Sequence, residues 1–340
     1  MASLTGGGAS GVTGWGLHDG GRTRAMLIND RRNVRKLAQV TGTKFAWLFA
    51  VSGVVAYAAD GLGWRDMLFP AGLVGILVAA VSIFLAFRIN AGYARWWHAR
   101  QSWGGIVNEC RSLGLYVGVL LRAGDTDAAA AQAWRRRVVL RQIAYVHALR
   151  LQLRGHPPAD WERDLWGRRI DGTPLLADAE AARLRGAGNV AAQILALQGR
   201  DIADFLHAAD GDPSWNRQVA IGELLRALYA RQGDAESIKT TVLAWGYVAY
   251  TRLLARALAV IVICSHLNSF TLAGAGLVAF IATVFLTVEQ VGRNLDNPFE
   301  GRFNDTPLSS LCRTVEIDLL QQIGEPCDLQ PLAPADGRLD

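Results

Sequence analysis

The stretch from Leu73 to Trp103 constrains this chain more than any other, because its character changes where no break in structure is expected. Residues 73–87 are apolar and uncharged, and with the residues before them they are long enough to cross a bilayer as a helix. From Arg88 onward the sequence is cationic and aromatic, with no proline or other signal that would end a helix. We therefore expect one helix that leaves the lipid and continues into a polar compartment. The lining of a pore can be built in this way.

Four membrane passes are expected along the chain. The first is roughly Phe45 to Ala59 and the second about Leu68 to Phe87. The apolar region from Val242 to Thr287 is predicted to form two more passes, separated by a tight polar turn at 265–269. With 340 residues, of which 51% are hydrophobic and 19% charged, the chain has material for one membrane part and one soluble part.

The distribution of basic residues predicts the orientation in the membrane. Lysines and arginines cluster before the first pass, at Arg22, Arg24, Arg31, Arg32, Arg35, Lys36 and Lys44. The turn 60–66 carries only Arg65, and the turn 265–269 carries no lysine or arginine. The positive-inside rule therefore places both termini and residues 88–239 in the cytoplasm, and the protein in the inner (plasma) membrane. The net charge of +5 follows from this topology and does not indicate a nucleic-acid partner, since no zinc-finger, RNP or helix-turn-helix pattern is present.

The segment between the second and third passes is predicted to be helical. Apolar residues recur at helical spacing in Gln101–Arg122, Ala128–Leu153, Gly188–His207 and Ser214–Arg231. The expected organisation is a basic cytosolic segment (1–43), two membrane helices (44–100), a cytosolic helical domain (101–239), two further membrane helices (240–291), a turn with a final cytosolic helix (292–324) and a disordered tail (325–340).

Three apolar residues of the second pass form one stripe on a helix. Ala79, Ile83 and Phe87 are spaced i, i+4 and i+8. Such a stripe usually packs on a neighbouring helix or on lipid, and periodicity alone favours that interpretation. Around a symmetry axis, the same stripe would form stacked apolar rings that close a pore by excluding water.

Two motifs resemble the bestrophin family. The pattern F-L-x-F-R-x-x-x-x-Y-x-R-W…A-R-x-x-W-G…R is matched by Phe84, Leu85, Phe87, Arg88, Tyr93, Arg95, Trp96, Ala99, Arg100, Trp103, Gly104 and Arg111. The block 295–308, with Asn297-Pro298-Phe299, is similar to the segment that follows the membrane helices in the family, and CRTVEIDLLQQIG is similar to the final helix. The similarity covers about Asp30 to Gly324.

The resemblance implies an all-α membrane protein that forms a homopentamer around one axial pore. The hydrophobic neck of the family would fall on Ala79, Ile83 and Phe87, although larger aliphatic residues than Ala79 are common in relatives. The cytosolic aperture of the pore would fall near Asn216 and Arg217.

Charged and aromatic residues around the neck allow two interpretations each. Arg88 would either set the electric field below the neck or pair with an acidic residue of a neighbouring helix. Arg252 and Arg256 would either line an anion-attracting vestibule or extend to the cytosolic edge of the bilayer, and the second is preferred. An interfacial collar is expected at Tyr93, Arg95, Trp96 and Trp97, where aromatic rings lie at the headgroup level.

The segment after the fourth pass is expected to be a structural turn. It contains Asn297, Pro298 and Phe299, and either Asp305 or Thr306 is predicted to cap a helix that starts at Pro307. In animal bestrophins the equivalent stretch is an acidic run that binds calcium. Here residues 300–305 hold only two acids and an arginine, so no metal or other cofactor is expected.

Passive conduction of small ions is therefore the expected function, with anions such as chloride favoured by the basic residues. A sodium-type cation channel of the same fold and a non-conducting membrane scaffold stay as alternatives. An enzyme is not expected, because the six histidines show no metal-binding spacing and no nucleophile or phosphate-binding motif is present.

Overall fold

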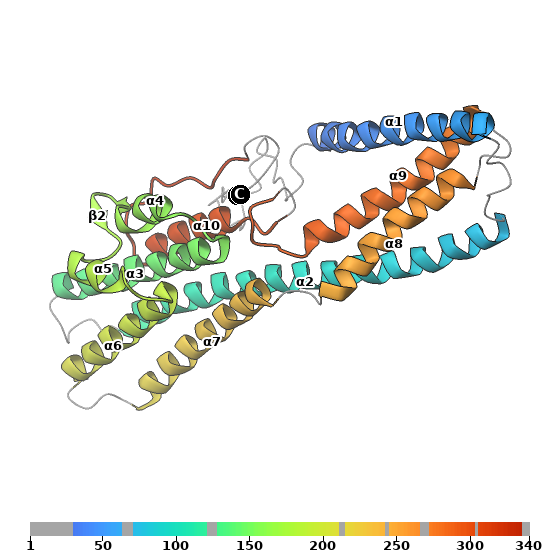
Figure 1. The fold of residues 1–340 in the computed structure, drawn as a ribbon. Coiled ribbons are helices and arrows are strands. Elements are labelled where there is room, and N and C mark those ends of the chain that lie inside the picture. The colour runs from blue at the N-terminus through green and yellow to red at the C-terminus, as the bar shows by residue number, and fades with distance from the viewer. Residues whose placement is uncertain are drawn as a thin grey trace, which may run out of the picture.

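One helix, α2 (Ala71–Leu120), runs through the whole length of the molecule and organises the fold (Figure 1). The computed structural model describes residues 30–62, 71–120, 128–210, 215–241, 245–265, 272–302 and 305–334. At 50 residues, α2 joins the second expected pass and the first expected helix of the soluble domain without interruption. It contacts α7, α8, α9 and α10, so it belongs to both halves of the protein.

The first half of α2 packs on two other apolar helices, α8 (Trp245–Cys264) and α9 (Leu272–Leu295), and α1 (Asp30–Leu62) packs on α9 and α8. All four are long and apolar enough to cross a membrane, as predicted. Their shared core contains small and aliphatic side chains, among them Leu48, Val81, Leu85, Leu258 and Ala279. In Figure 1 this four-helix part occupies one end of the molecule.

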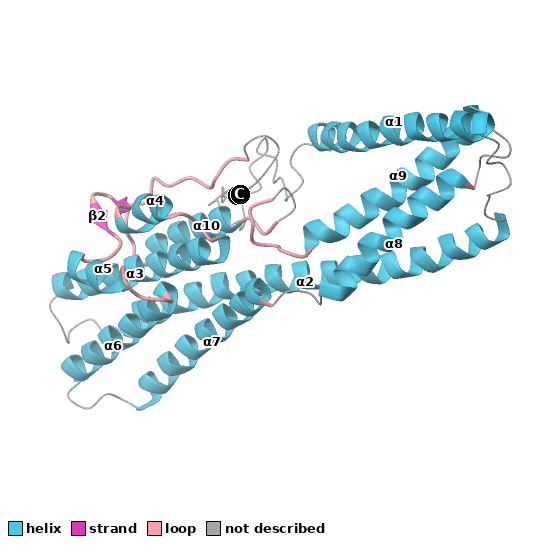
Figure 2. Cartoon of the chain, viewed as in Figure 1, coloured by secondary structure: helices cyan, strands magenta, loops and turns pink. Residues whose placement is uncertain are grey.

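The second half of α2 packs in a helical domain with α3 (Ala128–Arg154), α6 (Val190–Asp210), α7 (Trp215–Thr240) and α10 (Leu308–Gln322). α3 is the central helix, since every residue from 138 to 151 is buried. Its neighbours include Trp103 and Ile106 of α2 and Leu319 of α10 in one continuous core. Figure 2 shows that helices make up nearly all of both parts.

Small elements connect α3 to α6: α4 (Pro158–Trp161), the π-helical turn η2 (Glu162–Trp166), the hairpin of β1 (Arg169–Ile170) and β2 (Thr173–Pro174), and α5 (Asp178–Leu184). The hairpin was not predicted from the sequence. Its turn is made by Asp171 and Gly172, both with positive φ, which matches the two-residue turns that favour Asp-Gly. With two residues in each strand, it is too short to produce a detectable alternation of polar and apolar residues.

Two predicted boundaries differ from the structure. α7 continues to Thr240 instead of ending at Arg231. The segment 325–334, predicted to be disordered, lies against the helical domain, where Glu325 pairs with Arg136 and Leu329 packs on the core; residues 335–340 are outside the described part. An apolar and an ionic contact are therefore enough to order this proline-rich stretch.

The predicted cap of the last helix is also wrong. α10 begins at Leu308, and neither Asp305 nor Thr306 makes a side-chain capping bond to it. Asp305 instead accepts a hydrogen bond from the Arg302 backbone N–H at 2.8 Å, and burial raises the pKa of its carboxyl group. The Thr306 N–H donates to the Pro298 carbonyl, so these residues close the loop between α9 and α10 rather than start the helix.

A buried ionic cluster connects α3 to α10. Glu316 of α10 is fully buried and accepts from His147 Nε2 at 2.7 Å, beside Arg168 and Arg313. Burial lowers the pKa of His147, so the neutral ring donates from Nε2. Burial alone would raise the pKa of Glu316, but the hydrogen bond from His147 and the two arginines outweigh this and lower it. The carboxylate therefore stays charged inside the domain.

Candidate pore lining

Exposed residues form one continuous line along α2, from the membrane part into the helical domain. They recur at intervals of three or four residues, with half-buried Gly104 in the one longer gap. We call this line the exposed stripe of α2, and it comprises Ile76, Ala79, Ile83, Phe87, Asn90, Ala94, Trp97, Gln101, Asn108, Arg111 and Leu115. A repeat near 3.5 residues keeps one face of a long helix directed to one side if the helix supercoils to the left.

The opposite face of α2 is buried with the same period. Its members include Val81, Leu85, Arg88, Ala99, Trp103, Ile106, Cys110, Leu113 and Val117. Most of the exposed stripe is not covered by the described residues of the chain. Its one charged member, Arg111, pairs with Asp318 of α10, with Nε and Oδ2 2.7 Å apart.

The three residues of the predicted neck lie on the exposed stripe. Ile83 is 58% exposed and Phe87 is 63% exposed, and Ala79 is exposed as well. They come before the first polar member of the stripe, Asn90. The structure thus brings Ala79, Ile83 and Phe87 to one face without showing what covers that face.

Arg88 lies on the buried face and not beside the neck. Its side chain is 2% exposed and donates to the Asp296 carboxylate at the end of α9. Of the two interpretations of Arg88, the structure has the ion pair with an acidic residue at the end of a neighbouring helix. The helices approach closely here, because Gly92 leaves room for the Gly292 carbonyl and Leu295, which would lie 3.1–3.2 Å from an added Cβ.

The two arginines of α8 differ from each other. Arg252 lies 3.8 Å from Glu289, a buried carboxylate of α9 that also pairs with Arg293 at 3.0 Å. Arg256 is exposed, one turn further into the apolar part of α8, and makes no ion pair with the described residues. Arg256 is thus the vestibule candidate whose charge is not neutralised within the chain.

The expected interfacial collar divides into two kinds of contact. Tyr93, Trp96 and Trp97 form a chain of aromatic contacts, with ring centroids 5.8 and 6.2 Å apart. Arg95 does not extend outward with them; it donates to the carbonyls of Ile238 and Thr241 at the end of α7. Arg95 therefore connects α2 to the junction of α7 and α8, a role that the sequence did not indicate.

The predicted aperture residues lie at the start of α7. Asn216 is exposed and Arg217 is half-buried. α7 runs antiparallel to α2, since Ser102 bonds to Arg231 while Leu224 packs near Val117. Asn216 and Arg217 are therefore at the end of α7 that points away from the membrane helices (Figure 1).

The turn after α9 has a structural role in this geometry. Pro298 is buried and Phe299 is 1% exposed in the core of the helical domain, while Asn297 is half-buried. The sequence alone did not identify the neighbouring Asp296 as the partner of Arg88. The only signal was an acidic residue directly after an apolar helix, at the depth where a buried arginine needs a counter-charge.

Metal ligands do not gather anywhere in the described part of the chain. No group of three or more His, Cys, Asp or Glu side chains there is arranged to hold a metal ion.

Comparison with known proteins places the chain in a family. Residues 35–321 match the model of the bacterial and fungal bestrophin proteins. A protein of Mesorhizobium japonicum named voltage-dependent anion channel-forming protein mll4386 is 31% identical over 259 residues, or 75% of each chain. The similarly named YneE of Escherichia coli K12 is 29% identical over 273 residues, or 78% of this chain and 79% of YneE.

A solved structure has the same fold. The crystal structure of a bacterial bestrophin homolog from Klebsiella pneumoniae covers 84% of this chain and 99% of its own, with a TM-score of 0.73 at 23% identity. With the family match over most of its length, this chain is a member of the bacterial and fungal bestrophin family.

Proposed function

We propose that the protein is a homopentameric ion channel that passively conducts anions such as chloride. The observation that carries the proposal is the exposed stripe of α2, which extends, largely uncovered by the described residues, from Ile76 in the membrane part to Leu115 in the helical domain. Five copies around an axis would turn each of its residues into a ring, because closed symmetry repeats every side chain at one height. The names of the relatives from Mesorhizobium japonicum and Escherichia coli support anion conduction.

The neck of this channel consists of Ala79, Ile83 and Phe87. Rings of apolar side chains close a narrow pore to ions, because water leaves the constriction and hydrated ions cannot lose their shells cheaply. Ala79 is the smallest of the three, so Ile83 and Phe87 form the tight part of the neck.

Anion preference follows from the polar residues below the neck. From Asn90 to Asn108 the polar members of the stripe are the amides Asn90, Gln101 and Asn108; the guanidinium group of Arg111 is paired with Asp318 of α10. Amide N–H groups and positive charge stabilise anions in a pore. Arg256 adds a positive charge that has no ion-pair partner among the described residues, whereas Arg88 and Arg252 are opposed by Asp296 and Glu289.

The exit of the pore is formed by Asn216 and Arg217. Both are on the first turn of α7, at the far end of the helical domain, where a ring of amides and guanidinium groups would again favour anions. The protein lies in the inner (plasma) membrane with both termini in the cytoplasm, as the positive-inside rule predicts for Lys44 and the basic residues before it.

Electrical recording of the purified protein in planar bilayers tests the proposal. Reproducible unitary currents, and five subunits by native mass spectrometry of the detergent-solubilised protein, are the expected results. Persistent silence of folded protein would support the alternative of a membrane scaffold. Currents carried by sodium would support a cation channel of the same fold.

A further inference from the structure

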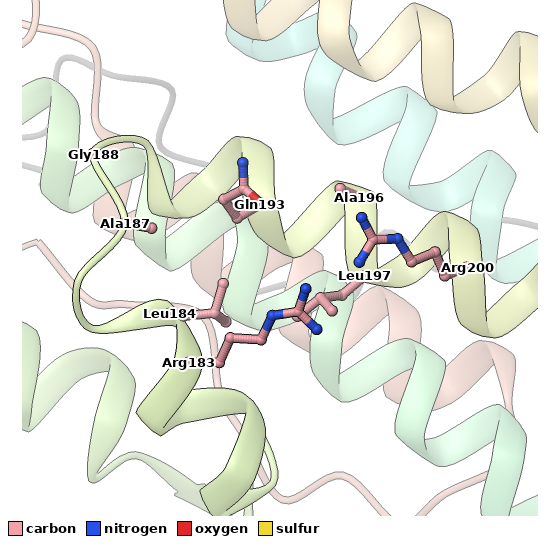
Figure 3. A pocket seen from close by; sticks show the side chains of 8 residues that line it. All are labelled: Arg183, Leu184, Ala187, Gly188, Gln193, Ala196, Leu197 and Arg200. Atoms are coloured by element: carbon pink, nitrogen blue, oxygen red, sulfur yellow. The ribbon is translucent and has the colours of Figure 1, made fainter.

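A cavity of about 240 Å³ lies between α5 and the first half of α6, in the helical domain and away from the exposed stripe of α2. Its polar walls are Arg183 of α5 with Gln193 and Arg200 of α6, and its apolar walls include Leu184 and Leu197. Figure 3 shows both guanidinium groups over the same hollow, with the Arg183 side chain extending toward α6. The cavity therefore presents two positive charges above an apolar floor.

These two arginines differ from most others of the helical domain, which have acidic partners. Such pairs join Arg137 and Arg141 to Asp201, Arg150 to Asp164, Arg168 to Glu316, and Arg185 to Glu162. Neither Arg183 nor Arg200 forms an ion pair with any described residue, although Asp204 is only one turn along α6 from Arg200.

Two like charges at one cavity repel each other, and an anion bound between them removes that repulsion. Arginine suits this role, because its planar group donates two parallel hydrogen bonds to a carboxylate or a phosphate. Gln193 adds an amide that donates to a further oxygen. The half-buried side chain of Leu197 gives the apolar body of a ligand a surface to pack on.

We propose that this cavity binds a small organic dianion, such as a dicarboxylate or a phosphate monoester. The size of the cavity sets the upper limit, since sites for drug-sized ligands measure roughly 300–1,000 Å³. The shared chemistry of these ligands is two negative charges on oxygen atoms. The site lies outside the proposed pore, so the proposal does not depend on conduction.

The direct test is isothermal titration of the full-length protein in detergent with succinate and with inorganic phosphate, at constant chloride concentration. At least one of the two is expected to bind saturably, with one site per chain. The double variant Arg183→Ala, Arg200→Ala is expected to weaken that binding about tenfold or more, because both charged contacts are lost. Preference for succinate would identify a dicarboxylate site, and preference for phosphate would identify a phosphate site.

Two control variants distinguish binding in this cavity from nonspecific electrostatic attraction of an anion to a basic protein. The double variant Arg169→Ala, Arg226→Ala removes the same charge from exposed positions outside the cavity and should leave the affinity unchanged. Ala196→Phe fills the cavity without changing the charge and should abolish binding. The proposal is overturned if neither anion binds, if the control double variant weakens binding equally, or if Ala196→Phe binds normally while its melting temperature shows that it is folded.

Discussion

α3 and α9 are both helices rich in apolar residues, yet they bury their side chains very differently. α3 is buried from residue 138 to 151 without a gap, among helices of the same chain. α9 is more apolar, but Leu277 and Phe280 are each 58% exposed and Val284 is 42% exposed. The helical domain completes a core within one chain, whereas the exposed apolar residues of the membrane part would face lipid or, in the proposed pentamer, other subunits.

α2 belongs to both parts of the molecule, and it exposes apolar side chains in each of them. Its exposed residues near Ile76 are at a depth where lipid can cover them. Leu115, however, is 63% exposed and Tyr116 is 39% exposed in the helical domain, where no lipid is expected. Exposed apolar side chains in water indicate a covering partner, and further copies of the same chain would provide it.

The largest effect on stability is expected from removing a buried charge in the core of the helical domain. Glu316→Ala leaves Arg168 and Arg313 without their buried counter-charge and the neutral His147 ring without its hydrogen-bond acceptor, so the free energy of unfolding should fall by about 3–5 kcal/mol. Thermal unfolding followed by circular dichroism in detergent measures this loss. Glu223→Ala is the matched control, because the pair of Glu223 with Arg226 is exposed and should contribute less than about 1 kcal/mol. Equal losses of unfolding free energy in Glu316→Ala and Glu223→Ala would contradict the expected difference between a buried and an exposed ion pair.

A somewhat smaller effect is expected at the ion pair where the two parts meet. Arg88→Met leaves the Asp296 carboxylate partly buried without a partner and should destabilise the protein by about 3 kcal/mol. Replacing both residues, in Arg88→Met with Asp296→Asn, should recover much of this loss. If the stability loss of the double variant equals the sum of the losses for Arg88→Met and Asp296→Asn measured separately, the two side chains do not interact energetically.

The neck should respond in conduction rather than in stability. Phe87→Ala widens the tight part of the proposed constriction and is expected to raise open probability or unitary conductance about tenfold. Phe280→Ala removes an equally exposed phenylalanine from α9, outside the exposed stripe, and should leave the currents unchanged. An unchanged single-channel record for Phe87→Ala would count against the neck.

The smallest effect is expected from acid at Asp164. Burial alone would raise the pKa of this carboxyl group, but hydrogen bonds from Arg163 and Arg150 outweigh it and lower the pKa to about 2. The unfolded chain has a value near ~3.9, so the contribution to stability is full above about pH 4 and is lost as the pH falls through about 2. Melting temperatures of the protein and of Asp164→Asn should therefore differ above pH 4 and converge toward pH 2. A constant difference across this range would exclude the ionised group as the cause.

Local signals in the sequence predicted the helices well, whereas contacts distant in sequence could not be predicted. The uninterrupted α2 follows from the absence of a proline between Leu73 and Trp103, and the spacing of Ala79, Ile83 and Phe87 already put them on one face. The partner of Arg88 could not be identified, because Asp296 is 208 residues away and its approach depends on how α2 packs on α9. Thr306 and Asp305 looked like helix caps, but the loop from Pro298 uses them for its own closure.

The reversal potential of the purified channel under a sodium chloride gradient tests the central claim most directly. It reports conduction and the sign of the permeant ion in one measurement, independent of any substitution. The account predicts a reversal potential close to the equilibrium potential of chloride, because the polar part of the exposed stripe holds the amides of Asn90, Gln101 and Asn108. A reversal potential close to that of sodium would contradict it.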